Sequence, residues 1–161
     1  MNQSKILSNK ILIISLSFIL CSAVLLFTAC NDGFDNSTKL NVNAPNTADA
    51  DLKYTAVTVN ANEDVYFCWT IADNTKDTAS AYSLVIVDKD KNALNKDNGL
   101  KSVTIYDSNK KSLGTATTDT AGNYNLSSVL GDNKIAGGTY YAVCQFDKDG
   151  TYNVNIQLIA K

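Results

Sequence analysis

The chain has 161 residues, a net charge of −2 at neutral pH and no histidine, and all fourteen of its basic residues are lysines. Histidine is the usual general base and the commonest metal ligand, and arginine is the usual clamp for phosphate and carboxylate groups. We therefore expect no enzyme, no metal and no cofactor. A mildly acidic chain without basic clusters gains nothing from counterion release, so we expect no nucleic-acid partner.

The first thirty residues carry an export pattern. Lys5 and Lys10 precede an apolar run over 11–29, which ends in small residues directly before Cys30. A positive start, an apolar middle and small residues before a break are typical of a signal peptide. The run has about nineteen residues, close to the ~20 that a membrane-spanning helix needs. An uncleaved membrane anchor is therefore the alternative interpretation.

The end of this run resembles the lipobox of bacterial lipoproteins. Thr28 and Ala29 fit the small positions before Cys30, whereas Phe27 stands where leucine is usual. The resemblance implies that residues 1–29 are removed and that the thiol of Cys30 receives lipid with acyl chains such as palmitate. Two or more chains attach a protein firmly to a bilayer. The mature protein would then be anchored in the cell membrane or outer membrane, facing the periplasm or the cell surface.

Residues 30–50 are rich in Asn, Asp, Thr and Ala and include Pro45, the only proline of the chain. Such a composition buries little apolar surface and is typical of a flexible linker. We therefore expect a lipidated N-terminus and linker at 30–50, in which 40–42 could form a short strand. The folded domain is expected at 51–161.

From residue 51 onward, short runs of Val, Ile, Thr and Tyr alternate with polar residues and end in turn residues. Alternation with a period of two indicates strands, and no segment with helical periodicity follows the leader. Regularly spaced strands of this kind predict an all-β fold, an antiparallel β-sandwich of seven to eight strands. We expect these strands at 54–59, 65–71, 82–87, 101–106, 113–118, 123–130, 139–146 and 152–159.

Three stretches resemble known sandwich families. VTIYDSNKKSLGTATTDTAGNYN at 103–125 is similar to bacterial immunoglobulin-like repeats. GGTYYAVCQFDKDGTYNVNI at 137–156 and VYFCWT at 65–70 are similar to strands of fibronectin type III domains. The resemblance covers 51–161 and implies an immunoglobulin-like sandwich, a fold that carries many unrelated functions. The insert at 88–100 has no counterpart in these families.

Two of the four cysteines remain after Cys21 leaves with the leader and Cys30 takes the lipid. In an oxidising compartment, Cys68 and Cys144 favour one disulfide. The alternative is two free thiols that pack as small apolar groups. Strand alternation places Cys144 on one face with Tyr140, Ala142 and Phe146, and places Cys68 on the face opposite Trp69. A disulfide between the sheets needs both cysteines inward, so with Trp69 inward it would require a β-bulge.

The segment at 88–92 begins like a calcium-binding loop, with the pattern D-x-D-x-N. However, Ala93 stands where that loop needs glycine, and Gly99 stands where it needs glutamate. We therefore expect a solvated hairpin turn at 88–92, and another at 147–150. The eight tyrosines are interpreted mainly as half-buried packing residues rather than ligand contacts.

These patterns together predict a non-catalytic binding or adhesion module of the cell envelope, with an unknown protein or glycan as its ligand. One alternative is a structural or accessory subunit of an envelope assembly, which an exposed apolar patch would indicate. An enzyme or small-molecule carrier is the less favoured alternative, because it would need a deep pocket with converging polar groups.

Overall fold

Strands form at most of the positions where apolar and polar residues alternate. The structure, a computed structural model, describes residues 33–75, 79–119, 121–130 and 137–161, so the leader and Cys30 lie outside the described residues. The described residues form eleven strands: β1 (Thr38–Lys39), β2 (Val42–Asn43), β3 (Thr55–Val59), β4 (Asp64–Ile71), β5 (Ala79–Val87), β6 (Leu100–Tyr106), β7 (Ser112–Thr115), β8 (Thr117–Thr118), β9 (Tyr124–Asn125), β10 (Gly138–Phe146) and β11 (Gly150–Ala160).

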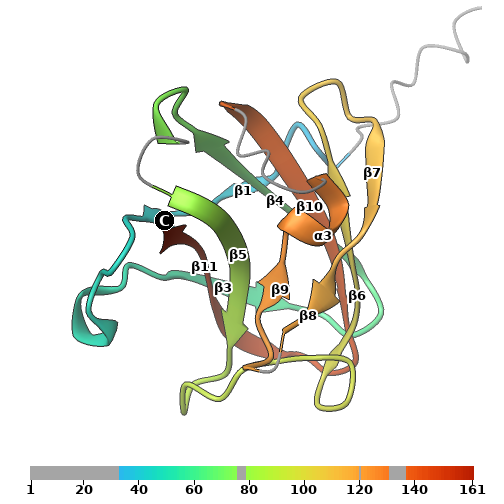
Figure 1. Cartoon of the computed structure of the whole chain (residues 1–161). Helices are drawn as coiled ribbons and strands as arrows, with labels where there is room; N and C mark the ends of the chain where they lie inside the picture. Colours follow the sequence, from blue (N-terminus) through green and yellow to red (C-terminus); the bar gives the residue numbers. More distant parts are fainter. Residues whose placement is uncertain (1–32, 76–78, 120, 131–136) are drawn as a thin grey trace, which may run out of the picture. The chain divides into compact units, whose positions relative to one another are not determined.

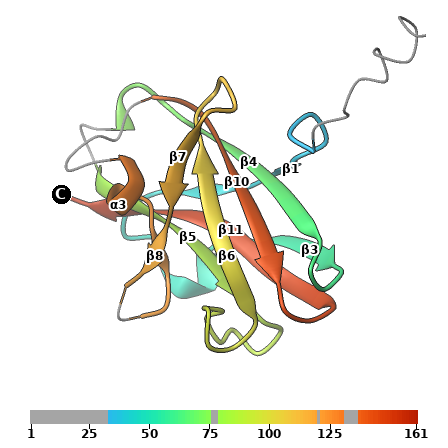
Figure 2. The ribbon, with the colours of Figure 1, turned by 90° about the vertical axis from the view of Figure 1, so that its right-hand side faces the viewer.

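These strands form two sheets that stack face to face (Figures 1 and 2). Sheet A has the order β1-β4-β10-β6-β7, and sheet B has the order β2-β11-β5-β9-β8 with β3 also paired to β11. The long strands pair antiparallel, whereas β1 and β2 pair parallel with β4 and β11, so both sheets are mixed. The predicted all-β sandwich is confirmed.

The connections between strands follow a jelly-roll pattern. Successive strands from β3 to β6 alternate between the two sheets, and so do β9, β10 and β11. Alternation of this kind is typical of a double-sheet jelly roll. In the immunoglobulin order the last two strands are neighbours in one sheet, whereas here β10 belongs to sheet A and β11 to sheet B. The sequence resembles immunoglobulin repeats because the jelly roll and the immunoglobulin fold are both built from short strands of alternating apolar and polar residues.

The core lies between the sheets and follows the predicted alternation. On β4, Phe67 and Trp69 are fully buried, while the intervening Cys68 faces outward and is half-buried. On β10, Ala142 and Cys144 are fully buried in the same way. Because side chains alternate across a strand, one apolar residue in two is sufficient to fill the space between two sheets.

The predicted linker at 30–50 is wrong over 33–43, because these residues are packed on the sandwich. The compact unit begins at Gly33. The backbone N–H of Leu40 donates to the carbonyl of Cys68 over 2.8 Å, and Leu40 is only 4 % exposed. The backbone N–H of Ile156 donates to the carbonyl of Asn41 over 2.9 Å. These contacts use the backbone, so a polar composition gave no sign of them.

Phe34 fixes the start of this segment on the outer face of sheet A. Its ring meets the rings of three tyrosines edge-on, with centroids 5.0–5.3 Å away. We name these residues, Tyr66, Tyr106 and Tyr141, the tyrosine cradle. Edge-to-face pairs of aromatic rings at this separation contribute about 0.5–1.5 kcal/mol each beyond the area that they bury.

The strand predicted at 123–130 is wrong in its second half. Only β9 is extended, and a single helical turn, α3 (Ser127–Leu130), follows it. Leu126 between them is fully buried, and its backbone N–H donates to the carbonyl of Tyr82 over 3.2 Å. Its own carbonyl then accepts from the N–H groups of both Val129 and Leu130 over 3.1 Å. The buried leucine thus ends the extended backbone and starts the turn.

Candidate functional site

The two lateral sides of the sandwich are built differently. On one side the N-terminal segment supplies β1 at the end of sheet A and β2 beside β11 in sheet B. On the other side the end strands are β7 of sheet A and β8 of sheet B, and Ala116 joins them. Figure 2 shows β6, β7 and β8 on this second side. A pocket opens here, where the two sheets diverge.

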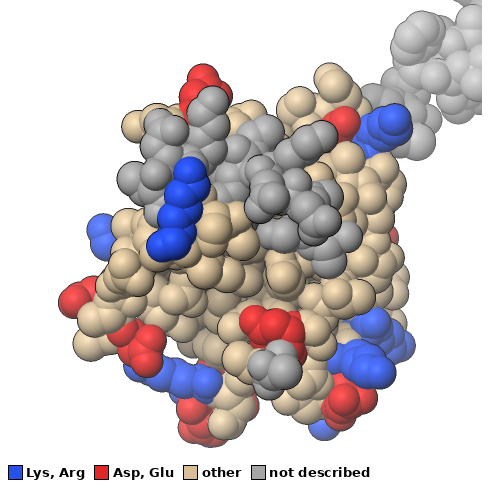
Figure 3. Space-filling model, viewed as in Figure 1, with Lys and Arg blue, Asp and Glu red and all other residues tan. Residues whose placement is uncertain are grey.

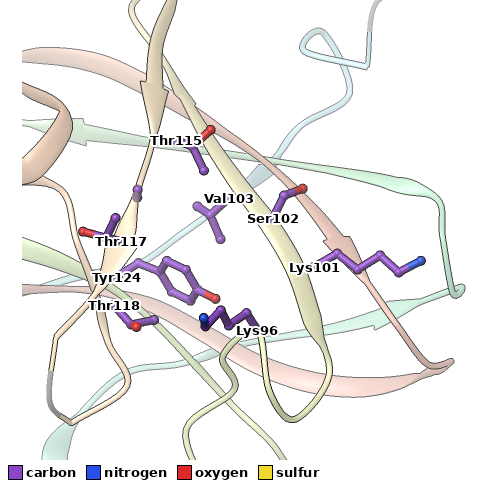
Figure 4. Close-up of a pocket in the computed structure, with 9 residues that line it drawn as sticks. Lys96, Lys101, Ser102, Val103, Thr115, Thr117, Thr118 and Tyr124 are labelled. Carbon is purple, nitrogen blue, oxygen red and sulfur yellow. The ribbon is translucent and has the colours of Figure 1, made fainter.

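This pocket, which we name the Lys96 pocket, has a volume of about 340 Å³. That volume is at the lower end of the ~300–1,000 Å³ range of small-molecule sites. Figure 4 shows its side chains, which come from β6, from the β7–β8 edge, from β9 and from the loop before β6. Its lining residues are Lys96, Lys101, Ser102, Val103, Thr115, Ala116, Thr117, Thr118 and Tyr124.

The floor of the pocket is apolar and rigid. Val103, Ala116 and Tyr124 are all at most 5 % exposed. The backbone N–H of Ala116 donates to the carbonyl of Val103 over 2.9 Å, which holds the crossing between the sheets in place. Burial raises the pKa of the Tyr124 phenol to about 12, with smaller contributions from Cys144 and Asp97. The phenol therefore remains protonated at neutral pH.

The loop before β6 positions Lys96 through a set of asparagine hydrogen bonds. The backbone N–H of Asn95 donates to the side-chain oxygen of Asn98 over 2.6 Å, and the side-chain oxygen of Asn95 accepts from the N–H of Asp97 over 2.8 Å. The side chain of Asn98 also donates to the carbonyl of Ala93 over 2.7 Å. These bonds fix the backbone on both sides of Lys96, which itself is exposed.

Lys96 supplies the available positive charge of the pocket. Within the described part of the chain its ammonium group has no hydrogen bond or ion pair. The ammonium group of Lys101 instead donates to Asn62 and lies 3.7 Å from the carboxylate of Asp147. Figure 4 shows the Lys101 side chain extending away from Tyr124. Lys96 is therefore the lining cation that a ligand could engage without breaking an existing contact.

The remaining lining groups are hydroxyls. Ser102 and Thr115 lie on one side of the pocket, and Thr117 and Thr118 lie on the other. Hydroxyl groups donate and accept hydrogen bonds, and a lysine ammonium group only donates. None of the lining residues is acidic. An ammonium group, several hydroxyls and an apolar floor suit a ligand that carries a carboxylate or another anionic group.

The predicted disulfide between Cys68 and Cys144 is wrong, because both cysteines are free. They lie on the paired strands β4 and β10, but Cys144 is opposite Val65 and Cys68 is opposite Tyr141. No bulge interrupts this pairing, so the thiols point to opposite faces of sheet A. Cys144 is fully buried, and Cys68 is half-buried under the N-terminal segment, with its Sγ 3.9 Å from the carbonyl of Ser37.

The hairpin turn predicted at 88–92 is confirmed. One carboxylate oxygen of Asp88 accepts from the backbone N–H groups of Asp90 and Asn92, over 2.8 and 2.9 Å. The same arrangement recurs at Asp107 and Asp119, each of which accepts from the residues two and four positions later. These carboxylates hold their own turns. Among the residues with described positions, no group of three acidic or cysteine side chains could hold a metal ion.

Lys96 was not identified from the sequence. The only indication was the insert at 88–100, which has no counterpart in the families that the rest of the domain resembles. Within it, Asn95 and Asn98 flank Lys96. Asparagines at this spacing favour a compact turn, and a structured insert is a candidate for function. The insert indicates where a site could lie but not which sheet edges complete it.

No family model matches the chain, and no curated protein matches it either. Among solved structures it is similar to the pre-peptidase C-terminal domain of a collagenase from Bacillus anthracis, with a TM-score of 0.39, 12 % identity, and coverage of 74 % of this chain and 95 % of that chain. It is also similar to PliG of Salmonella Typhimurium, a periplasmic inhibitor of g-type lysozyme, with a TM-score of 0.35, 14 % identity, and coverage of 76 % and 99 %.

No helix among the residues that the structure describes is long and apolar enough to cross a membrane.

Proposed function

We propose that this protein is a non-catalytic binding module of the bacterial cell envelope that captures an acidic segment of a partner protein at the Lys96 pocket. The observation that carries the proposal is the charge of this pocket. It holds an ammonium group without a partner in the described structure, and its lining includes no acidic side chain. An ion pair with an exposed ammonium group contributes about 0.2–1 kcal/mol, which favours a carboxylate over a neutral group.

The position of the pocket favours a protein ligand over a glycan. Thr117 and Thr118 form β8, which is the end strand of sheet B, and both are exposed. An end strand offers backbone groups to an extended peptide, which can add to the sheet while its alternate side chains enter neighbouring pockets. A peptide paired with β8 would pass beside Lys96, where an acidic side chain could meet the ammonium group.

Attachment to the envelope belongs to the same proposal. The leader pattern supports lipidation of Cys30 and removal of residues 1–29. Growth with a labelled fatty acid tests it: the wild-type protein should carry label, and Cys30→Ser should carry none. Label retained on Cys30→Ser would contradict the assignment of the modified residue, and it would leave the ligand proposal intact.

Binding is tested with two strand-forming peptides that differ only in glutamate against glutamine. The acidic peptide should bind, and the neutral peptide should bind about two- to fivefold more weakly. Lys96→Ala should remove this preference. Lys89→Ala is the matched control, because Lys89 is also an exposed loop lysine, and its ammonium group pairs with the neighbouring Asp90 at 2.6 Å. Equal binding of both peptides to the wild-type protein, or failure of both to bind, would overturn the proposal.

The surface disfavours the alternative of a subunit held in an assembly by apolar contacts. Among the described residues, Ile159 is the one large apolar side chain that is exposed, at 44 %. Stable interfaces of obligate assemblies bury large apolar patches. A single isoleucine does not form such a patch.

A further inference from the structure

A second cavity lies on the outer face of sheet B, on the opposite side of that sheet from the core. We name it the outer groove. Its volume is about 350 Å³, and it lies between the 49–54 segment, strand β5 and two hairpin turns. Figure 3, in the view of Figure 1, shows the described charged side chains mainly near the margin of the molecule. The lining residues are Asp49, Leu52, Tyr54, Val85, Val87, Lys91, Ala93, Ala121, Asn123 and Gln157.

The floor of the groove is apolar although it lies outside the core. Alternation along β5 places Leu84 and Ile86 in the core and Val85 and Val87 on the outer face. These two valines are nevertheless only 6 % and 5 % exposed. Both valines line the cavity with the small part of their surface that stays exposed, and the apolar face of a small ligand can rest there.

Tyr54 forms one wall of the groove, beside a buried polar group. Asn155 pairs with Val85 across the sheet and is fully buried, and neither end of its carboxamide makes a hydrogen bond. Burial raises the pKa of the Tyr54 phenol, Asp49 raises it further, and the nearby carboxamide of Asn155 lowers it. The two side chains are therefore close, but they lack hydrogen-bond geometry. An unpaired buried carboxamide is costly unless another group completes its hydrogen bonds.

The rim of the groove carries polar side chains that include a hydrogen-bond acceptor, a donor and two groups that do both. Asp49 accepts, Lys91 donates, and the amides of Asn123 and Gln157 do both. Within the described structure none of these four side-chain ends makes a hydrogen bond. One acidic and one basic group leave the lining with no net charge. This neutrality distinguishes the outer groove from the Lys96 pocket, whose charged lining residues are all lysines.

The rim is also held in shape without a ligand. Asp88 and Asp119 close the two hairpin turns that carry Lys91 and Asn123. The turns touch: a Cβ added to Gly122 would lie 3.1 Å from the Cβ of Ala93. A preformed rim reduces the ordering cost of binding, which would otherwise consume the small free energy that a few neutral hydrogen bonds provide.

We propose that the outer groove binds a neutral saccharide unit. A pyranose ring has an apolar C–H face and a rim of hydroxyls that both donate and accept. The apolar face fits the valine floor and the ring of Tyr54, and the hydroxyls fit the amides and the two charged groups of the rim. A charged ligand gains nothing from a lining without net charge, and a purely apolar ligand would leave four polar ends desolvated and unpaired. The site is separate from the Lys96 pocket.

The test is a titration of the full-length chain, in a zwitterionic detergent without sugar head groups, with neutral disaccharides of glucose, galactose and N-acetylglucosamine. Amide resonances are followed by NMR. At least one disaccharide should shift the resonances of Val85, Asn123 and Gln157 and leave those of Val103 and Ala116 unchanged. Tyr54→Ala should weaken binding roughly tenfold, and Tyr54→Phe should retain most of it.

Two further variants keep the outcome decisive. Gln157→Ala removes a side chain that makes no hydrogen bond in the described structure, so it should fold normally and bind several-fold more weakly. Lys96→Ala should bind the disaccharide as the wild type does. The proposal is overturned if no disaccharide shifts any groove resonance. It is also overturned if Gln157→Ala binds like the wild type, or if Lys96→Ala removes saccharide binding.

Discussion

The ring of Phe34 meets the ring of Tyr66 edge-on, with 5.1 Å between their centroids and 78° between their planes. The adjacent Gly33 also lies against this tyrosine, and a Cβ at that position would displace the Tyr66 ring. Lys110 adds to the contact, with its ammonium group 5.8 Å from the Phe34 centroid and 2.8 Å from the carboxylate of Asp35. The first described residues are therefore part of the fold and not a spacer before it.

Phe34→Ala should lower the free energy of unfolding by about 1–3 kcal/mol, because it removes three edge-to-face contacts from a half-buried ring. Urea denaturation measures this change. The variant should also be cut more readily by protease between Phe34 and Leu40. Asp35→Ala is the control, since loss of an exposed ion pair should cost less than about 1 kcal/mol. Equal stability of Phe34→Ala and the wild type would show that the cradle does not hold the segment.

Because Cys68 and Cys144 are free thiols, a reducing agent should have no effect on the stability of the protein. The melting temperature should be the same with and without dithiothreitol, because there is no bond between Cys68 and Cys144 to break. Native protein should react with a thiol reagent at the half-buried Cys68 and not at the fully buried Cys144. Mass spectrometry of digested protein identifies the labelled residue. A lower melting temperature in dithiothreitol would contradict the structure.

Burial of Cys144 predicts a loss of stability at alkaline pH. Burial raises the pKa of this thiol far above its ordinary value, so the native state keeps the proton that the unfolded state releases. The stabilisation is complete below the unfolded pKa of ~8.5 and is lost as pH rises toward the higher folded pKa. The free energy of unfolding should fall by about 1 kcal/mol between pH ~9 and ~10.

Urea titrations at these two pH values measure the slope. Cys144→Ala should be less stable at neutral pH, because it leaves a small cavity, but its slope should be shallower. Cys68→Ala, which removes a thiol on the outer face, is the matched control and should keep the wild-type slope. Above pH ~10 the phenol of Tyr124 should add to the loss, since burial raises its pKa to about 12.

Two substitutions in the hairpin turns should change the free energy of unfolding in opposite directions. Lys91 has a φ of 63°, a left-handed conformation that costs a residue with a side chain about 1–2 kcal/mol. Lys91→Gly should therefore raise the free energy of unfolding by about 0.5–1 kcal/mol after the extra freedom of glycine is counted. Asp119→Ala should lower it by about 1 kcal/mol, because two backbone N–H groups lose their acceptor. Thermal melting compares both variants, and a less stable Lys91→Gly would contradict this account.

Strand positions and faces could be predicted because they depend on local alternation. The period of two along 65–71 placed Phe67 and Trp69 in the core and Cys68 outside. The same rule identified the conflict between an inward Trp69 and the inward Cys68 that a disulfide between the sheets would need. Burial of apolar side chains determines the face of a strand, and a sequence displays this directly.

Other features depend on contacts that leave no local pattern. Packing of 33–43 uses backbone hydrogen bonds and one isolated aromatic residue, Phe34, within a polar stretch. The jelly-roll order depends on which strands pair at a distance, and short alternating strands suit several sandwich topologies equally. The Lys96 pocket combines an insert with two sheet edges that lie far apart in the chain. Nothing in the sequence of any one segment reveals such a combination.

The tyrosine cradle lies on the outer face of sheet A, whereas Leu40 is inserted between the sheets. Phe34 comes before Leu40 in the chain, so a pulling force on the N-terminal end reaches the outer contact before the core contact. A force applied to the N-terminal end of the unit acts first on Phe34. That ring can be pulled away without opening the core, whereas pulling out Leu40 would expose the core between the two sheets. The first residues should therefore extend under tension and absorb work while the sandwich and both cavities remain intact.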